Sequence, residues 1–152
     1  MTIHFIGGLR SNYRNTVLIY KMPDKNCTMP PITFPVSPFG NYPIIDVEIC
    51  NRTIKALVDT GATTSSIDME LAKQLTLNAV GETEYLSHGN TTQKAKVVEA
   101  VISIRIFLIS SQFIVAPFYD HNFQMLIGCD ILKHFKVVYT GNEISLERME
   151  KR

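Results

Sequence analysis

Apolar and polar residues alternate along most of the chain after residue 42, as is typical of β-strands with one buried face. Ile45, Val47 and Ile49 alternate with polar neighbours, and a return strand follows a short turn at Asn51 and Arg52. The predicted strands are residues 45–50, 53–59, 83–87, 93–106, 107–116, 136–140 and 143–148. The pattern predicts a mainly β chain, because strands do not alternate with long helices.

Two short segments have helical spacing, so we expect one or two short helices. Residues 65–75 include Ser66 and Asp68 as candidate N-caps. A second helical segment follows Gly128, and Asp130 is expected to cap its start rather than to take part in chemistry.

Glycine and asparagine mark the tips of two predicted hairpins, because both residues tolerate positive φ angles. His88-Gly89-Asn90 separates the strands at 83–87 and 93–106, and Gly141-Asn142 separates the last two strands. The long return strand has an apolar face made by Val98, Ala100, Ile102, Ile104 and Ile106.

The N-terminal part of the chain has a different composition. Six of the seven prolines lie between Pro23 and Pro43, where fixed φ angles and missing N–H donors exclude a helix interior or a central strand. We therefore expect a proline-rich arm at residues 1–41, which packs loosely or covers an edge, and a folded domain at residues 42–152.

Composition narrows the class of protein. The 152 residues are 45% apolar and 19% charged, with a formal net charge of +1, as in ordinary soluble globular proteins. A broad basic surface for nucleic acid is not expected. No apolar run approaches the roughly 20 residues of a membrane span, and residues 1–15 lack the pattern of a secretion signal. These features favour a cytoplasmic location without membrane or nucleic-acid partners.

Cysteine and histidine show no pattern of a disulfide framework or a metal site. The three cysteines lack Cys-x-x-Cys spacing and are expected to be reduced and mostly buried. The four histidines have no ligand spacing, so neither a metal nor another cofactor is expected.

The candidate chemistry is centred on Asp59-Thr60-Gly61, in the segment ALVDTGATTSS. An apolar strand delivers the carboxylate to a turn, and a glycine lets a ligand or partner chain approach the backbone. A second apolar motif, LIGCD at residues 126–130, follows later in the chain. The simpler alternative is that Asp59 is a turn residue that accepts a hydrogen bond from its own backbone.

Together ALVDTGA and LIGCDIL resemble the retropepsin family, which includes retroviral proteases and the protease-like domain of DNA-damage-inducible shuttle proteins. The resemblance spans residues 42–147. GNTTQKAKVVEAVISI and FQMLIGCDILKHFKVVY resemble the shuttle-protein branch in particular. The resemblance implies a small closed acid-protease barrel that functions as a homodimer.

The family's activity would be hydrolysis of peptide bonds in extended polypeptides by an aspartic endopeptidase. Such catalysis needs two carboxylates that share a proton, and the chain has one Asp-Thr-Gly. The second catalytic Asp59 would therefore come from a second copy of the chain. No metal, cofactor or covalent intermediate is implied.

The resemblance also assigns supporting roles. Thr60 would bond across the two-fold axis, Gly61 would offer its carbonyl to substrate, and Ala62 and Gly128 would pack around the catalytic turn. A flap tipped by His88, Gly89 and Asn90 would close over the peptide. Retroviral enzymes carry an Asp and an Arg that form an ion pair at the dimer interface. Thr63 and Cys129 stand at these two positions here, so this ion pair is not expected.

Two other functions fit the same residues. A dimeric barrel of this type could bind extended peptides without cutting them, and Asp59→Asn would then affect binding little. A purely structural barrel would lose at most stability on the same substitution. Lys94, Lys96, Lys133 and Lys136 are expected to be solvated strand and helix surface rather than a nucleic-acid patch.

Overall fold

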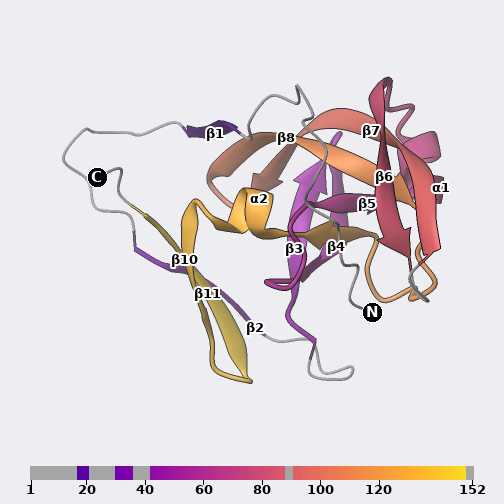
Figure 1. Ribbon diagram of the computed structural model, residues 1–152. Coiled ribbons are helices and arrows are strands. Elements are labelled where there is room, and N and C mark those ends of the chain that lie inside the picture. Colours follow the sequence, from indigo (N-terminus) through magenta and orange to yellow (C-terminus); the bar gives the residue numbers. More distant parts are fainter. Residues whose placement is uncertain (1–16, 21–29, 36–41, 88–90, 150–152) are drawn as a thin grey trace.

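The computed structural model describes residues 17–20, 30–35, 42–87 and 91–149. Within these residues the chain is mainly β, with two short helices, α1 (Met69–Gln74) and α2 (Cys129–Leu132) (Figure 1). This confirms the expected fold class. The closed barrel, the homodimer and the domain boundary at residue 42 stay predictions.

Eight strands form the larger sheet, in the order β1-β8-β5-β9-β4-β3-β7-β6. Their bounds are β1 (Val17–Tyr20), β3 (Ile44–Ile49), β4 (Arg52–Val58), β5 (Ser66–Asp68), β6 (Ala79–Ser87), β7 (Thr91–Ile104), β8 (Phe107–Ala116) and β9 (Met125–Ile127). Because β7 pairs with β8 as well as with β3, the sheet curls back on itself. The buried apolar side chains form two clusters, the main core and a smaller one that includes Leu57 and Ala62.

A second sheet has the order β10-β11-β2, from β10 (Phe135–Tyr139), β11 (Glu143–Arg148) and β2 (Ile32–Pro35). It projects to one side, opposite β6 and β7 (Figure 1). Phe34 of the arm is 3% exposed and belongs to the main apolar core. The described parts of residues 1–41 thus add a strand to each sheet, β1 beside β8 and β2 beside β11.

Alternation of side chains explains how the longest strand is buried. Along β7 the apolar face at Val98, Ala100, Ile102 and Ile104 is buried as expected, but Ile106 is 55% exposed. The expectation for Ile106 was wrong because the strand ends before it. Arg105, with a φ of 56°, begins the tight turn into β8.

The chain has four more strands than the pattern predicted. β1 and β2 lie in the proline-rich arm, and β5 and β9 have three residues each, too few for a visible alternation. Ser66 lies in β5 rather than at a helix N-cap. Asp68 does occupy the N-cap position of α1, but its side chain bonds no helix N–H; its Oδ1 accepts from the N–H of Phe118 at 3.0 Å.

Candidate active site

Asp59 follows directly after β4, on a turn that hydrogen bonds fix from both sides. Its N–H donates to the carbonyl oxygen of Ile127 at 2.9 Å, and its carbonyl accepts from the N–H of Ala62 at 3.2 Å. The half-buried side chain accepts a hydrogen bond at Oδ1 from the N–H of Gly61, at 2.8 Å. The other oxygen, Oδ2, accepts none from the described residues.

The contact with Gly61 is the one expected of a turn aspartate. The same geometry is compatible with a catalytic carboxylate, so the two interpretations of Asp59 do not exclude each other. A single hydrogen bond fixes the orientation of the carboxylate. The free Oδ2 leaves an acceptor for a water molecule or a substrate group. Thr60 and Gly61 are exposed, whereas Ala62 is fully buried.

Parallel pairing of β4 with β9 brings the second motif beside this turn. Val58 is the register partner of Ile127, so Gly128 emerges next to the residues that follow Asp59. A Cβ on Gly128 would lie 2.8 Å from the carbonyl oxygen of Ala62 and from the carbonyl carbon of Thr64. Only a glycine lets the two backbones approach this closely.

Ser65 and Asp130 connect the two motifs, and the sequence analysis missed Ser65. The Ser65 hydroxyl donates to Asp130 Oδ1 at 2.7 Å and accepts from the N–H of Gly128 at 3.0 Å. The N–H of Ser65 also donates to Asp130 Oδ2 at 3.0 Å. Ser65 is fully buried, so these bonds are shielded from water. The only sequence signal was a serine close to the catalytic turn.

Asp130 has a different role from the expected helix cap. Gly128 is the N-cap of α2, and Asp130 lies inside the first turn, where its Oδ1 also accepts from the N–H of Ile131 at 3.0 Å. Burial raises the pKa of the Asp130 carboxyl, while the hydrogen bonds from Ser65 and Ile131 lower it less strongly. Through these hydrogen bonds the partly buried carboxyl group braces two chain segments against each other.

The cysteines differ from expectation. Cys50 and Cys129 are exposed rather than buried, and Cys27 lies outside the described residues. Cys129 Sγ donates to the carbonyl oxygen of Thr60 at 3.2 Å. The N–H of Cys129 donates to the carbonyl oxygen of Ala62 at 2.7 Å, which adds to the contacts between the motifs.

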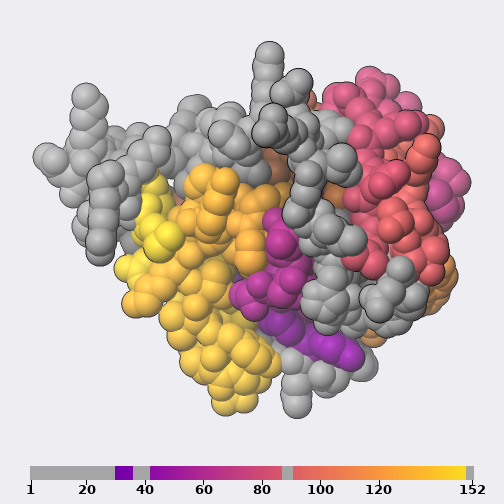
Figure 2. Space-filling view, viewed as in Figure 1, coloured from indigo at the N-terminus to yellow at the C-terminus, as the bar shows by residue number. Residues whose placement is uncertain are grey.

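On the other side of the site, β6 and β7 form a long hairpin. Its predicted tip, His88-Gly89-Asn90, lies outside the described residues. Tyr85 and Ala95 on this hairpin belong to the same apolar cluster as Leu57 and Ala62. Figure 2 shows the red and pink surface of the hairpin region and the orange and yellow C-terminal surface on opposite sides of one face, with purple strands between them.

Two comparisons of sequence address the family. Residues 45–134 match the family described as "gag-polyprotein putative aspartyl protease", which is more than half of the chain. The chain belongs to this retropepsin-like aspartic protease family. DNA damage-inducible protein 1 of Saccharomyces cerevisiae is 31% identical over 91 residues, which cover 59% of this chain but only 21% of that protein. The chain thus spans about a fifth of that relative's length.

Solved retropepsin-like structures share the fold. A retropepsin-like aspartic protease from Rickettsia conorii is 19% identical, with a TM-score of 0.60 over 88% of this chain and 94% of that one. The retroviral protease-like domain of Ddi1 from Leishmania major is also 19% identical, with a TM-score of 0.50 over 72% and 94%.

The described residues contain no group of three or more His, Cys, Asp or Glu side chains that could hold a metal ion. In the same part of the chain, no helix has the length and apolar character needed to cross a membrane. Lys94, Lys96, Lys133 and Lys136 are all exposed.

Proposed function

We propose that this retropepsin-type chain is an aspartic endopeptidase that works as a homodimer, with one Asp59 from each copy. The observation that carries the proposal is the state of Asp59. Its position and one oxygen are fixed by the turn, while Oδ2 accepts no hydrogen bond from the described residues. A carboxylate held in this way is preorganised to bind and deprotonate a water molecule.

A second chain is needed because the other two carboxylates near the turn, Asp130 and Asp68, already accept hydrogen bonds from within the chain. Asp130 holds Ser65, and Asp68 holds the N–H of Phe118. Two identical Asp59 side chains across a two-fold axis would supply the missing group, since a symmetric dimer repeats each contact. Thr60, exposed beside Asp59, would bond across that axis.

The two carboxylates would share one proton, because like charges this close cannot both ionise without cost. The ionised Asp59 takes a proton from water, which then attacks the scissile carbonyl carbon. Asp59 of the partner subunit, protonated, donates to the carbonyl oxygen. The proton that Asp59 took from water then passes to the leaving nitrogen, and one hydroxyl of the tetrahedral diol returns its proton to the carboxylate pair. The peptide bond thus breaks without a covalent intermediate.

An extended polypeptide would bind between the catalytic turn and the hairpin of β6 and β7. Main-chain hydrogen bonds, including one to the carbonyl of Gly61, would give affinity, and side-chain pockets would give selectivity. His88, Gly89 and Asn90 would close over the peptide and exclude water.

The test is cleavage of an unbiased peptide library between about pH 4 and 7, with sedimentation velocity to determine the oligomeric state. Asp59→Asn should lower cleavage about 10⁴-fold, because it removes both the base and the acid. Asp46→Asn is the matched control, since Asp46 is exposed and pairs with Lys55; it should leave cleavage unchanged.

Each alternative function has its own outcome. A folded dimer that binds peptides, never cuts them and tolerates Asp59→Asn would be a peptide-binding module. A chain that neither binds nor cuts, and responds to Asp59→Asn only in stability, would be a structural barrel. Cleavage that survives Asp59→Asn would overturn the assignment of the catalytic group.

A further inference from the structure

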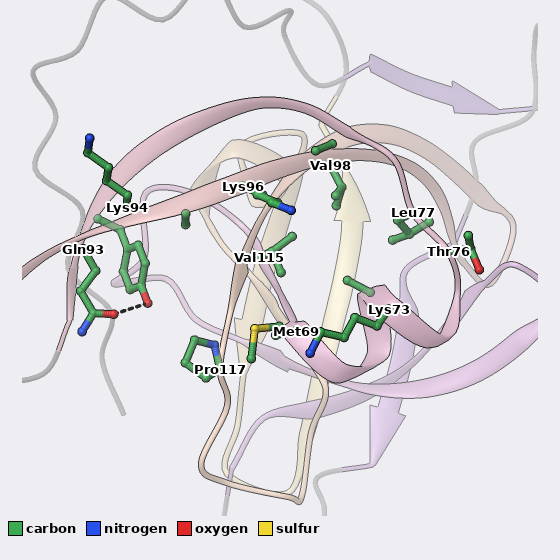
Figure 3. Close-up of a pocket in the computed structure, with 14 residues that line it drawn as sticks. Met69, Lys73, Thr76, Leu77, Gln93, Lys94, Lys96, Val98, Val115 and Pro117 are labelled. Carbon is green, nitrogen blue, oxygen red and sulfur yellow. Dashed lines mark hydrogen bonds between the residues drawn. The ribbon is translucent and has the colours of Figure 1, made fainter.

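A cavity of about 550 Å³ lies between α1 and the base of the β6–β7 hairpin (Figure 3). Its walls come from α1, the turn after it, β6, β7 and the end of β8. None of the residues from Asp59 to Asp68 lines it, so it is separate from the candidate active site. Its volume is in the range of small-molecule sites.

The interior of this cavity is apolar, with Met69, Leu77, Val98 and Val115 among its lining residues. Lys73 of α1 and Lys96 of β7 lie on opposite walls, and Figure 3 shows both side chains beside the hollow. Lys94 of β7 also lines the cavity. Among the residues that the structure describes, no Asp or Glu lines the cavity. An apolar interior with cations at its edge is complementary to a molecule with an apolar chain and an anionic head.

Carboxylates close to Lys73 and Lys96 do not prevent these lysines from binding a ligand carboxylate. Lys73 contacts Glu70 at 3.1 Å, but both side chains are about two-thirds exposed (64% and 65%), and such pairs contribute little. Glu82 is the register partner of Lys96 on β6, yet it does not line the cavity. A ligand carboxylate between the two walls would therefore meet two ammonium groups and no competing anion within the lining.

We propose that this cavity binds an amphipathic carboxylate of the medium-chain fatty acid type. The chain lies against Met69, Leu77, Val98 and Val115, and the carboxylate lies between Lys73 and Lys96. The occupant joins α1 to β7 and so links the hairpin base to the body of the sheet. This site contains no residue of the turn at Asp59, but it shares the β6–β7 hairpin with the proposed substrate cleft, since Tyr85, Gln93 and Ala95 line it. Decanoate binding is measured without substrate, so its failure is distinguishable from a failure of the proposed proteolysis.

Titration calorimetry with decanoate, on the full chain and below the concentration at which decanoate forms micelles, tests the proposal. We expect one molecule bound per chain, with an affinity that rises about fourfold for each added methylene from octanoate to dodecanoate, equivalent to about 0.8 kcal/mol. Amides of β7 should exchange hydrogen more slowly when decanoate is bound, since a ligand stabilises the state that it binds.

Charge variants locate the head group. Lys73→Gln and Lys96→Gln should each weaken decanoate binding about two- to fivefold, as expected for exposed ion pairs, and the double variant more. Lys133→Gln and Lys136→Gln are matched controls, because neither residue lines the cavity, and they should change little. Circular dichroism checks folding, although all four side chains are on the surface.

Two results would overturn the proposal. One is no measurable decanoate binding at millimolar concentration. The other is equal affinity of the wild type for decanoate and decyltrimethylammonium, or equal affinity of the wild type and the Lys73/Lys96 double variant for decanoate. The lysines would then not select an anionic head group.

Discussion

The turn that follows Asp59 and the β6–β7 hairpin are built in opposite ways. The turn at residues 59–65 is held by a segment far away in sequence, residues 127–130, through hydrogen bonds that involve buried Ser65 and Gly128. The hairpin is held mainly by its own ladder, in which Gly81 to Ser87 pair with Thr91 to Val97. Most side chains of this ladder, including Glu84 and Lys94, are exposed.

This difference matches what each region must do in the proposed function. A reacting carboxylate must stay within a fraction of an ångström of its productive position, which requires buried bonds to a rigid neighbour. An element that opens for substrate needs low local stability, which a hairpin with few buried contacts provides. Substitutions in the turn should therefore cost more stability than substitutions in the hairpin.

The largest effect is expected from Gly128→Ala. The new Cβ would meet backbone atoms of Ala62 and Thr64 at 2.8 Å, and backbone cannot move aside as a flexible side chain can. We expect a loss of about 3 kcal/mol in the free energy of unfolding, measured by urea titration. Gly141→Ala is the control: Gly141 has a φ of 88° and open space around it, so only about 1 kcal/mol of backbone strain is expected. Equal losses would show that the close approach at Gly128 relaxes without cost.

Ser65→Ala is expected to have the next largest effect. It leaves the buried N–H of Gly128 without the hydroxyl acceptor and removes a donor from Asp130, at a cost of about 1–3 kcal/mol. The neighbouring Ser66 is equally buried, but its hydroxyl has no hydrogen-bond partner among the residues that the structure describes. Ser66→Ala should therefore be neutral or stabilising. If the two substitutions cost the same, burial rather than hydrogen bonding determines the loss.

The sequence predicted the strands that are long enough to alternate and the turn at Gly141-Asn142 between β10 and β11. It could not predict β5 and β9, whose three residues follow from tertiary pairing rather than from a local pattern. Nor could it predict that Phe34 of the proline-rich arm is buried in the core, because that position depends on the pairing of β2 with β11.

At the site, sequence predicted Asp59 and the nearness of the second motif but not the brace between them. Asp130 was expected to cap a helix, because a carboxylate at a helix start ordinarily bonds local N–H groups. Its main partner, Ser65, lies 65 positions earlier, and no local pattern connects the two. The exposure of Cys129 likewise follows from its place beside Thr60 rather than from its residue type.

The Asp130 brace should make stability depend on pH. Burial raises the pKa of its carboxyl above the ordinary 3.8, so the folded chain holds this proton more tightly than the unfolded chain. The resulting stabilisation is complete below the ordinary pKa and is lost as the pH rises through the folded-state pKa. The wild type should thus lose stability relative to Asp130→Asn as the pH rises from about 4 to 7. Urea titrations of both proteins measure the difference; a difference that grows in favour of the wild type with rising pH would contradict the sign.

The smallest effect is expected in the hairpin, where Glu84 lies directly opposite Lys94 in the ladder. Glu84→Lys places two positive charges in a cross-strand pair, which costs about 0.2–1 kcal/mol. Because the hairpin contributes little to the buried brace, the loss should appear as faster hydrogen exchange in β6 and β7 with global unfolding almost unchanged. Glu84→Gln, which removes the attraction without adding repulsion, should give an intermediate exchange rate. A global loss as large as that of Ser65→Ala would show that the hairpin and the turn unfold as one unit, and the contrast between them would not hold.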